Sequence, residues 1–149
     1  MIASLEALYS RELNKLIAEI NAYSNAKNLW LVPDGITNSA GNLCLHLIGN
    51  LNHFIGTHLG GTDYVRQRDL EFSQKHVAVA TMTDQIEELK KVVTNTLHAM
   101  QDQELQEDFP ILVFADQRQL TKGFMLTHLL GHLSYHLGQI NYHRRLLDI

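Results

Sequence analysis

The residues of this sequence best suited to chemistry are its histidines, which gather in two windows that carry no charged side chain. The stretch THLLGHLSYHLGQINYH, at residues 127–143, contains four of them, and no Asp, Glu, Lys or Arg occurs between Lys122 and Arg144 or between Asp34 and Asp63. Seven of the nine histidines fall in these two windows. A buried imidazole needs hydrogen-bond partners or a metal ion. A single one is more simply a hydrogen-bonded core residue, but the cluster predicts a metal site.

Helical geometry limits which histidines can share one ion. Residues four apart in a helix rise by about 6 Å and residues eight apart by about 12 Å, whereas the nitrogen ligands of zinc lie about 2.0–2.1 Å from the ion. His132 can therefore join His128 or His136, but His128 and His136 cannot serve the same ion. His143, about 10 Å beyond His136 along the helix, is excluded from either pair.

A third ligand has to come from another element, because two histidines leave a metal ion underfilled. His46 and His53, in the first charge-free window, are the candidates. Counting residues from the expected helix ends does not decide between them. Cys44 lies two residues before His46, roughly opposite it on a helix, so a buried apolar role is favoured for it over a ligand role. The sequence has neither HExxH nor a Glu three residues before a His, which excludes the zincin and di-iron motifs.

Four stretches have the spacing of apolar residues that is typical of helices. Asn38 or Ser39 is the expected N-cap of the second helix, Thr83 is that of the third, and Gly60-Gly61 ends the second. The third helix turns one apolar face to the core, formed by Ile86, Leu89, Val93, Leu97 and Met100. The predicted helices cover residues 2–28, 39–58, 84–100 and 121–147.

The connections between these helices complete the expected fold. Residues 63–83 have no sustained period and form the longest connection, which in a compact domain is typically a functional or covering loop. Residues 111–114 are expected to form a short extended piece. The sequence therefore predicts an all-α fold, with residues 1–149 forming one four-helix bundle domain. The expected order is up-and-down, with the second and fourth helices parallel.

The charge-free windows coincide with the second and fourth predicted helices. A helix without charged residues has little surface left for water, so both are expected to be largely buried, in the core or in an interface. Neither is a membrane span, because polar residues interrupt the apolar run. Gly49, Gly56, Gly131 and Gly138 each cost a helix about 1 kcal/mol relative to alanine. Either a close approach of the two helices or room for a ligand is expected to offset that cost.

Composition excludes several classes of partner. The formal net charge of −4 and the absence of a basic stripe argue against nucleic acid and against an anionic membrane surface. The first residues follow an amphipathic pattern rather than that of a signal peptide, and the lone Cys44 supports no disulfide framework. A cytoplasmic location is expected.

Three segments of the sequence resemble one family. YHLGQI at residues 135–140, preceded by His132, is similar to the HxxYHxGQI signature of the last helix of the DinB/YfiT-like metal-binding four-helix bundles. HLIGNL at residues 46–51 and YVRQRDLEF at residues 64–72 resemble the second helix and the arginine-rich loop of an uncharacterised branch of that superfamily. The resemblance covers nearly the whole chain.

The resemblance implies a metal triad of His46, His132 and His136. It further implies a left-handed variant of the up-and-down bundle, a homodimer, and a divalent ion such as zinc or nickel. Some members of the superfamily are S-transferases or isomerases that use a low-molecular-weight thiol. The branch that this chain resembles has no settled reaction.

Three neutral imidazoles leave a divalent ion with its full charge and an open position, as in catalytic zinc sites. Such an ion acidifies a thiol or a water molecule, so the sequence predicts a metal-dependent thiol S-transferase-like or hydrolase-like enzyme acting on a small molecule. The alternative is a non-catalytic helical module that binds metal or forms dimers. The substrate and the catalytic residues are not predicted.

Several further residues are candidates for the surroundings of the ion. Gln139 lies one turn beyond His136 and could bind a ligand or a metal-bound histidine, or could link two helices. His53 and His128 could line the cavity beside the ion. Arg66 and Arg68, with Asp69 and Glu71, could cover the site and hold a substrate carboxylate, although loop charges are usually paired internally or solvated. Tyr135 is interpreted as a packing residue.

Overall fold

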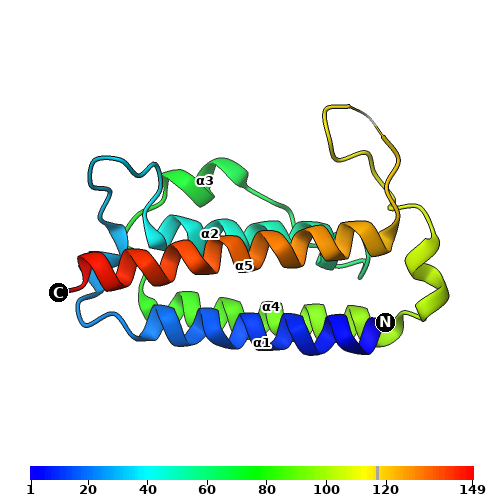
Figure 1. The fold of residues 1–149 in the computed structure, drawn as a ribbon, viewed down its shortest axis with the longest axis horizontal. Coiled ribbons are helices and arrows are strands. Elements are labelled where there is room, and N and C mark those ends of the chain that lie inside the picture. Colours follow the sequence, from blue (N-terminus) through cyan, green and yellow to red (C-terminus); the bar gives the residue numbers. More distant parts are fainter. Residues whose placement is uncertain (117) are drawn as a thin grey trace.

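Four long helical segments lie side by side along the molecule, and a short helix covers one of them (Figure 1). The structure is a computed structural model that describes residues 1–116 and 118–149. Within these residues there is no β-strand, only an isolated bridge between Asp108 and Thr121, so the predicted all-α class is confirmed. The α-helices are α1 (Ile2–Asn21), α2 (Ala40–Leu51), α3 (Arg68–Ser73), α4 (Val79–Ala99) and α5 (Lys122–Leu147).

The order of helix directions differs from the prediction. The residues that continue α2 lie beside α4 in the same order along both segments: Gly56 is next to Val92, and Gly60 is next to Thr96. α2 and α4 are therefore parallel. α1 and α4 are antiparallel, whereas α1 and α5 are parallel, which leaves α2 and α5 antiparallel (Figure 1). The predicted up-and-down order is therefore wrong. The long connection after α2 returns the chain to the end of the molecule where α2 began.

α1 ends earlier than residue 28, and a separate 3₁₀ helix, η1 (Ala26–Trp30), follows it. Asp148, the C-cap of α5, accepts hydrogen bonds from the backbone N–H groups of Ser24 and Asn25 and from the side chain of Asn28. These bonds hold the chain out of the helical path.

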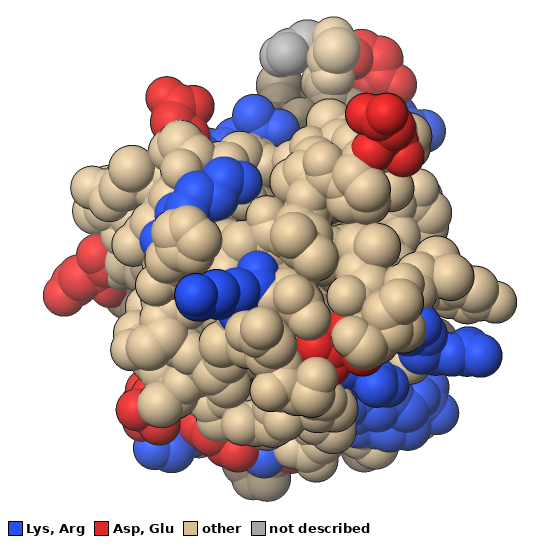
Figure 2. Space-filling view, turned by 90° about the vertical axis from the view of Figure 1, so that its left-hand side faces the viewer, with Lys and Arg blue, Asp and Glu red and all other residues tan. Residues whose placement is uncertain are grey.

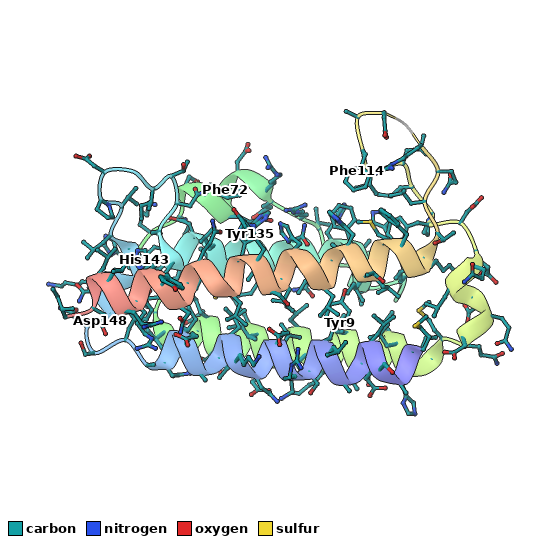
Figure 3. All side chains as sticks on the ribbon, in the orientation of Figure 1. Tyr9, Phe72, Phe114, Tyr135, His143 and Asp148 are labelled. Carbon is teal, nitrogen blue, oxygen red and sulfur yellow. The ribbon has the colours of Figure 1, made fainter. Side chains whose placement is uncertain are left out.

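The side chain of Tyr9 points from the middle of α1 toward α5, where its hydroxyl donates to the carbonyl of Leu126 (Figure 3).

The second predicted helix is present, but its last turns are wider than expected. Ser39 is the N-cap of α2, and its hydroxyl accepts a hydrogen bond from the N–H of Asn42. After Leu51 the chain continues as a π-helix, η2 (Asn52–Thr57), in which the N–H of His58 donates to the carbonyl of His53. Gly61 then takes a left-handed conformation that ends the helix, as predicted.

The long connection and the third predicted helix both differ from expectation. Residues 63–83 are not all loop, because α3 forms inside them. α4 begins at Val79 after the N-cap Ala78, whose side chain offers no capping group, so the predicted cap Thr83 is wrong. Thr83 lies inside the helix and accepts a hydrogen bond from Asn21 on α1. The predicted core face is confirmed for Ile86, Leu89, Val93 and Leu97, which are buried. Its fifth member, Met100, is half-buried.

The C-terminal part of the chain follows the prediction most closely. α5 begins after the N-cap Thr121, whose hydroxyl accepts a hydrogen bond from the N–H of Phe124, and it ends at Leu147. Before it stands the short 3₁₀ helix η3 (Asp102–Gln106). Residues 111–114, predicted to form a short extended piece, belong to no strand and no helix.

The two charge-free helices differ in burial. Every residue of α2 is buried, as predicted. α5 buries seven residues and leaves Tyr135 and Tyr142 about two-thirds exposed, at 64% and 63%, so the core of the single chain does not bury the whole helix. Burial of its exposed face in an interface stays a prediction. A side chain at Gly131 or Gly138 would meet nothing within 4 Å. Of the two alternatives predicted for these glycines, close approach of the helices is therefore wrong at Gly131 and Gly138 in the single chain.

Charged side chains are dispersed over the end of the molecule where the C-terminus lies. Figure 2 shows basic and acidic side chains there in separate groups among uncharged ones, rather than one continuous basic patch. No described helix is long and apolar enough to cross a membrane.

Candidate metal centre

Three histidines from two helices converge on one point. The Nε2 atom of His132 lies 3.2 Å from that of His46 and 3.1 Å from that of His136. Nitrogen ligands that surround one ion tetrahedrally at about 2.0–2.1 Å lie about 3.3–3.4 Å apart. Two of the three spacings are thus close to those of ligands of a single ion, and the ligand atoms of all three histidines lie within 4.8 Å of one another. No other group of three or more potential ligands occurs in the described part of the chain.

Each helix supplies its part of this geometry in a simple way. His132 and His136 are four residues apart on α5 and so share one face of it. His46 is on α2, which packs against α5 and is buried along its whole length, so its backbone is fixed by packing on every side. Sequence spacing left His46 and His53 as alternatives, and the structure brings His46 to the pair on α5.

The second ring nitrogen of His46 is held by a carboxylate. Nδ1 of His46 lies 2.9 Å from Oε1 of Glu71, which is 5% exposed. Arg66 donates two hydrogen bonds of 2.8 Å to the same carboxylate, one to each oxygen. Burial alone would raise the pKa of Glu71, but the bonds from Arg66 and His46 together lower it. An ionised carboxylate only accepts, so Nδ1 of His46 carries a proton, and in the neutral ring Nε2 then presents its lone pair toward His132.

His136 has a similar but uncharged partner. Its Nδ1 lies 2.7 Å from Oε1 of Gln139, and the amide nitrogen of Gln139 donates in turn to the hydroxyl of Tyr135. Because an amide oxygen only accepts, His136 also carries its proton on Nδ1 and presents a lone pair from Nε2. Burial lowers the pKa of His136, although the hydrogen bond to Gln139 opposes this shift. This side chain is therefore a neutral imidazole at neutral pH, the form that binds metal ions.

His132 is the ring whose hydrogen bonds cannot all be satisfied within the cluster. Burial and the neighbouring His136 and His46 lower its pKa to about 4. Its Nδ1 atom is buried without a partner among the described residues. Its Nε2 faces the lone pairs of two other Nε2 atoms but carries at most one proton, so it cannot donate a full hydrogen bond to both. A cation at the centre of the three Nε2 atoms would satisfy all of them, so these histidines could hold a metal ion.

The other candidate residues lie around the centre rather than in it. His53 belongs to η2, where the wide turn sets its ring 4.6 Å from that of His58, centroid to centroid. His128 packs edge-on against Phe114 and stacks at 6.5 Å on His132. His128 therefore lies beside the candidate ligand His132, whereas the ring contacts of His53 are with His58 and Phe54 and not with the three histidines.

The loop arginines have partners within the chain. Arg66 is bound to Glu71, as described, and the guanidinium of Arg68 lies 5.3 Å from the centre of the Phe72 ring. Phe72 in turn lies 5.0 Å from the ring of His46, centre to centre. The sequence indicated Glu71 as part of a covering loop but not as the partner of His46, and it gave no role to Phe72. Both lie on α3, which is too short for a periodic signal.

His143 shows what a histidine without a ligand role looks like in the same helix. It is buried, its Nδ1 lies 2.8 Å from the hydroxyl of Tyr23, and its Nε2 lies 2.9 Å from the carbonyl oxygen of Leu31. Both ring nitrogens therefore have a partner. Its exclusion from the cluster, predicted from helical rise, agrees with this placement.

A cavity of about 570 Å³ borders the centre on the side of α5. The loop of residues 33–38 forms one wall, and the second half of α5 forms the other, with His136 and Gln139 among the lining residues. Asp34 is the one Asp, Glu, Lys or Arg in this lining, and Tyr135 and Tyr142 add aromatic surface. A small, mostly uncharged molecule could reach His136 along this cavity.

Comparison with known proteins gives a family but no activity. No curated protein matches the chain. The family model described as a protein of unknown function (DUF1572) matches residues 6–148, nearly the whole chain, and the chain therefore belongs to that family.

Proposed function

We propose that the protein is an enzyme that depends on one divalent metal ion, bound by His46, His132 and His136. The observation that carries the proposal is the convergence of three Nε2 atoms, two of them turned inward by acceptors on Nδ1. Two such acceptors, Glu71 and Gln139, fix the proton positions that metal binding requires. A set of core histidines packed for stability alone has no need of this arrangement.

The ligand set supports a catalytic rather than a structural ion. Structural zinc sites have four protein ligands, whereas catalytic sites have three and leave one position open. Within the described residues the cluster contains three potential ligands. Cys44 is fully buried in α2, and burial raises the pKa of its thiol to about 12, which disfavours it as a fourth ligand. A zinc or nickel ion bound in this way would lower the pKa of a water molecule or a thiol that reached it.

The surroundings favour a small-molecule substrate and S-transfer or hydrolysis. The cavity beside His136 has one charged wall residue, Asp34, so it suits a neutral or weakly polar molecule. Gln139 lines this cavity while it holds His136, and its amide is therefore placed to contact both. We infer that a low-molecular-weight thiol is the co-substrate if the reaction is S-transfer. A water molecule takes that place if it is hydrolysis.

The proposal assigns the chain to the DinB/YfiT-like four-helix bundles. HLIGNL and YHLGQI support this assignment, because the histidines that match the signature of that superfamily, His46, His132 and His136, are those that converge. The homodimer that the resemblance implies is supported by the uncharged, exposed face of α5. The cytoplasmic location and the lack of a nucleic-acid partner remain predictions from composition.

A second candidate function is a metal-binding or dimer-forming helical module without catalysis. The exposed face of α5 favours it, since Tyr135, Tyr142 and Phe124 are exposed along one helix with no charged residue between Lys122 and Arg144. An ion that holds a module together differs from a catalytic ion in its effect on folding. Removal of the ion unfolds the module, whereas an open catalytic site loses its ion and stays folded.

Metal analysis of the purified protein tests the proposed function. We expect about one equivalent of zinc or nickel per chain, which is the load of a mononuclear site. The ion is lost in His46→Ala and in His136→Ala and is kept in the matched control His53→Ala. Thermal melting with and without EDTA accompanies the analysis, and we expect a folded protein in both cases. Retention of the ion in His46→Ala together with its loss in His53→Ala would contradict the assignment.

A further inference from the structure

α3 is attached to α2 through its backbone as well as through Glu71. Asn42, a fully buried residue of α2, donates hydrogen bonds of 2.9 Å from its side-chain amide to the carbonyl oxygens of Glu71 and Gln74. On the other side of the same short helix, the ring of Phe72 lies against the ring of His46. The position of Glu71 relative to His46 is therefore set by a buried polar contact and by an aromatic contact.

Gly49 makes room for the carboxylate of Glu71. It lies three residues after His46 and so shares a face of α2 with it. A Cβ atom at position 49 would lie 2.6 Å from the carboxyl carbon of Glu71 and would overlap its Oε2 atom. The carboxylate thus occupies the space that a side chain at residue 49 would fill. The glycine of the HLIGNL segment has a physical reason, which is access of this carboxylate to Nδ1 of the histidine.

We propose that Glu71 is a positioning residue for the metal ligand His46, and that Gly49 is required because it admits the Glu71 carboxylate. The inference rests on the proposed function, since it concerns the affinity of the same three histidines for an ion. Glu71 holds the proton of His46 on Nδ1 and fixes the ring plane, so that Nε2 points at the cluster before any ion arrives.

Arg66 neutralises the Glu71 carboxylate, so that this carboxylate can orient His46 without adding a net negative charge beside the three histidines. Its two hydrogen bonds to Glu71 pair the buried negative charge with a positive one, and its side chain is itself 13% exposed. The pair is neutral as a whole, so a divalent ion beside it would keep its own charge. Arg66 therefore pairs with Glu71, and its guanidinium also lies 3.5 Å from Nδ1 of His46.

A double-mutant cycle on metal affinity tests the proposal. The variants are Gly49→Ala, Glu71→Ala and the double variant, with Gly138→Ala as the matched control because a Cβ there would meet nothing within 4 Å. Affinity for zinc is measured by competition with a chelator, and the visible spectrum of the cobalt-loaded protein reports the ligand geometry. Loss of a group that orients a metal ligand typically lowers affinity about 10- to 100-fold, and we expect this for each single variant. The control keeps the affinity of the unmodified protein.

The double variant distinguishes positioning from a general packing defect. If Gly49→Ala acts by displacing Glu71, it lowers the affinity no further once residue 71 is alanine. The proposal would be overturned if the loss of zinc affinity in the double variant equalled the product of the losses in the two single variants. Unchanged zinc affinity and an unchanged cobalt spectrum in both single variants would also overturn it. If Gly49→Ala does not fold, Glu71→Gln and Glu71→Ala are compared, and equal, undiminished affinity in both overturns it. Absence of metal binding by the unmodified protein would instead refute the proposed function.

Discussion

α2 and α5 have the same sequence signature, a long stretch without charged residues, but they lie in different environments. α2 is surrounded by α3, α4, α5 and η1, and all of its residues are buried. α5 contacts α1 and α2 on one side, while its other side carries exposed aromatic residues and open glycines. The absence of charged residues therefore has a different structural basis in each helix. In α2 it accompanies complete burial, whereas in α5 it leaves an exposed, uncharged surface.

The two helices also contribute differently to the candidate metal centre. α2 contributes one candidate ligand, His46, from a buried position, and a carboxylate contacts its Nδ1 atom. α5 contributes two candidate ligands, of which His136 borders a cavity and has a neutral amide as its hydrogen-bond partner. The buried helix thus provides the fixed reference of the site, and the exposed helix provides its access.

Truncation of one leucine in each helix should give the largest contrast. Leu47 of α2 is fully buried, whereas Leu146 of α5 is 66% exposed. Leu→Ala in a packed core costs about 2–5 kcal/mol in the free energy of unfolding, and exposed substitutions usually stay within about 0.5 kcal/mol. We expect Leu47→Ala to fall in the first range and Leu146→Ala in the second, as measured by urea unfolding. Equal losses at both positions would mean that α5 is covered in solution.

Much of this arrangement is encoded locally and could be predicted from the sequence. Ser39 and Thr121 cap α2 and α5 with their own hydroxyl groups, and both starts were predicted. The start of α4 was missed because Ala78 offers no cap, and α3 was missed because six residues are too few to show a period. Helix directions were wrong because they depend on the path of residues 58–78, which lack a pattern.

The candidate site could be predicted only in part, for a similar reason. Helical rise alone excluded His143 and reduced the ligands on α5 to two pairs. The choice between His46 and His53 depends on the axial offset between two helices, which spacing within either helix does not contain. The contact between Glu71 and His46 joins residues 25 apart in sequence, and no local feature other than the glycine at position 49 indicates it.

An alanine in place of an α5 glycine should have a smaller effect of opposite sign. Gly131 is exposed, and an added Cβ would meet nothing within 4 Å. Alanine is favoured over glycine inside a helix by about 1 kcal/mol. We expect Gly131→Ala to raise the free energy of unfolding by up to that amount in urea denaturation of the metal-free protein. A loss of stability that grows with protein concentration would show instead that this face packs closely against a second copy of the chain.

The smallest expected effect concerns how the two helices are anchored at the end of the molecule they share. α2 begins with the uncharged cap Ser39, whereas α5 ends with Asp148, which accepts hydrogen bonds from Ser24, Asn25 and Asn28. Led by the backbone bond from Ser24, these contacts lower the pKa of Asp148 from 3.8 to about 2. A carboxyl group whose pKa is lowered on folding stabilises the fold above its unfolded pKa, and this contribution disappears as the pH falls through the folded value.

We therefore expect the metal-free protein to be more stable than its Asp148→Asn variant at neutral pH, with a difference that shrinks as the pH falls from near 4 toward about 2. Both proteins share the acidic groups Glu12 and Glu19 and the half-buried His132, so their titration cancels in the difference. The measurement is the free energy of unfolding by urea at several pH values. A difference that does not change with pH would mean that the charge of Asp148 plays no part in holding η1 to the end of α5, and that its hydrogen-bonding shape alone does so.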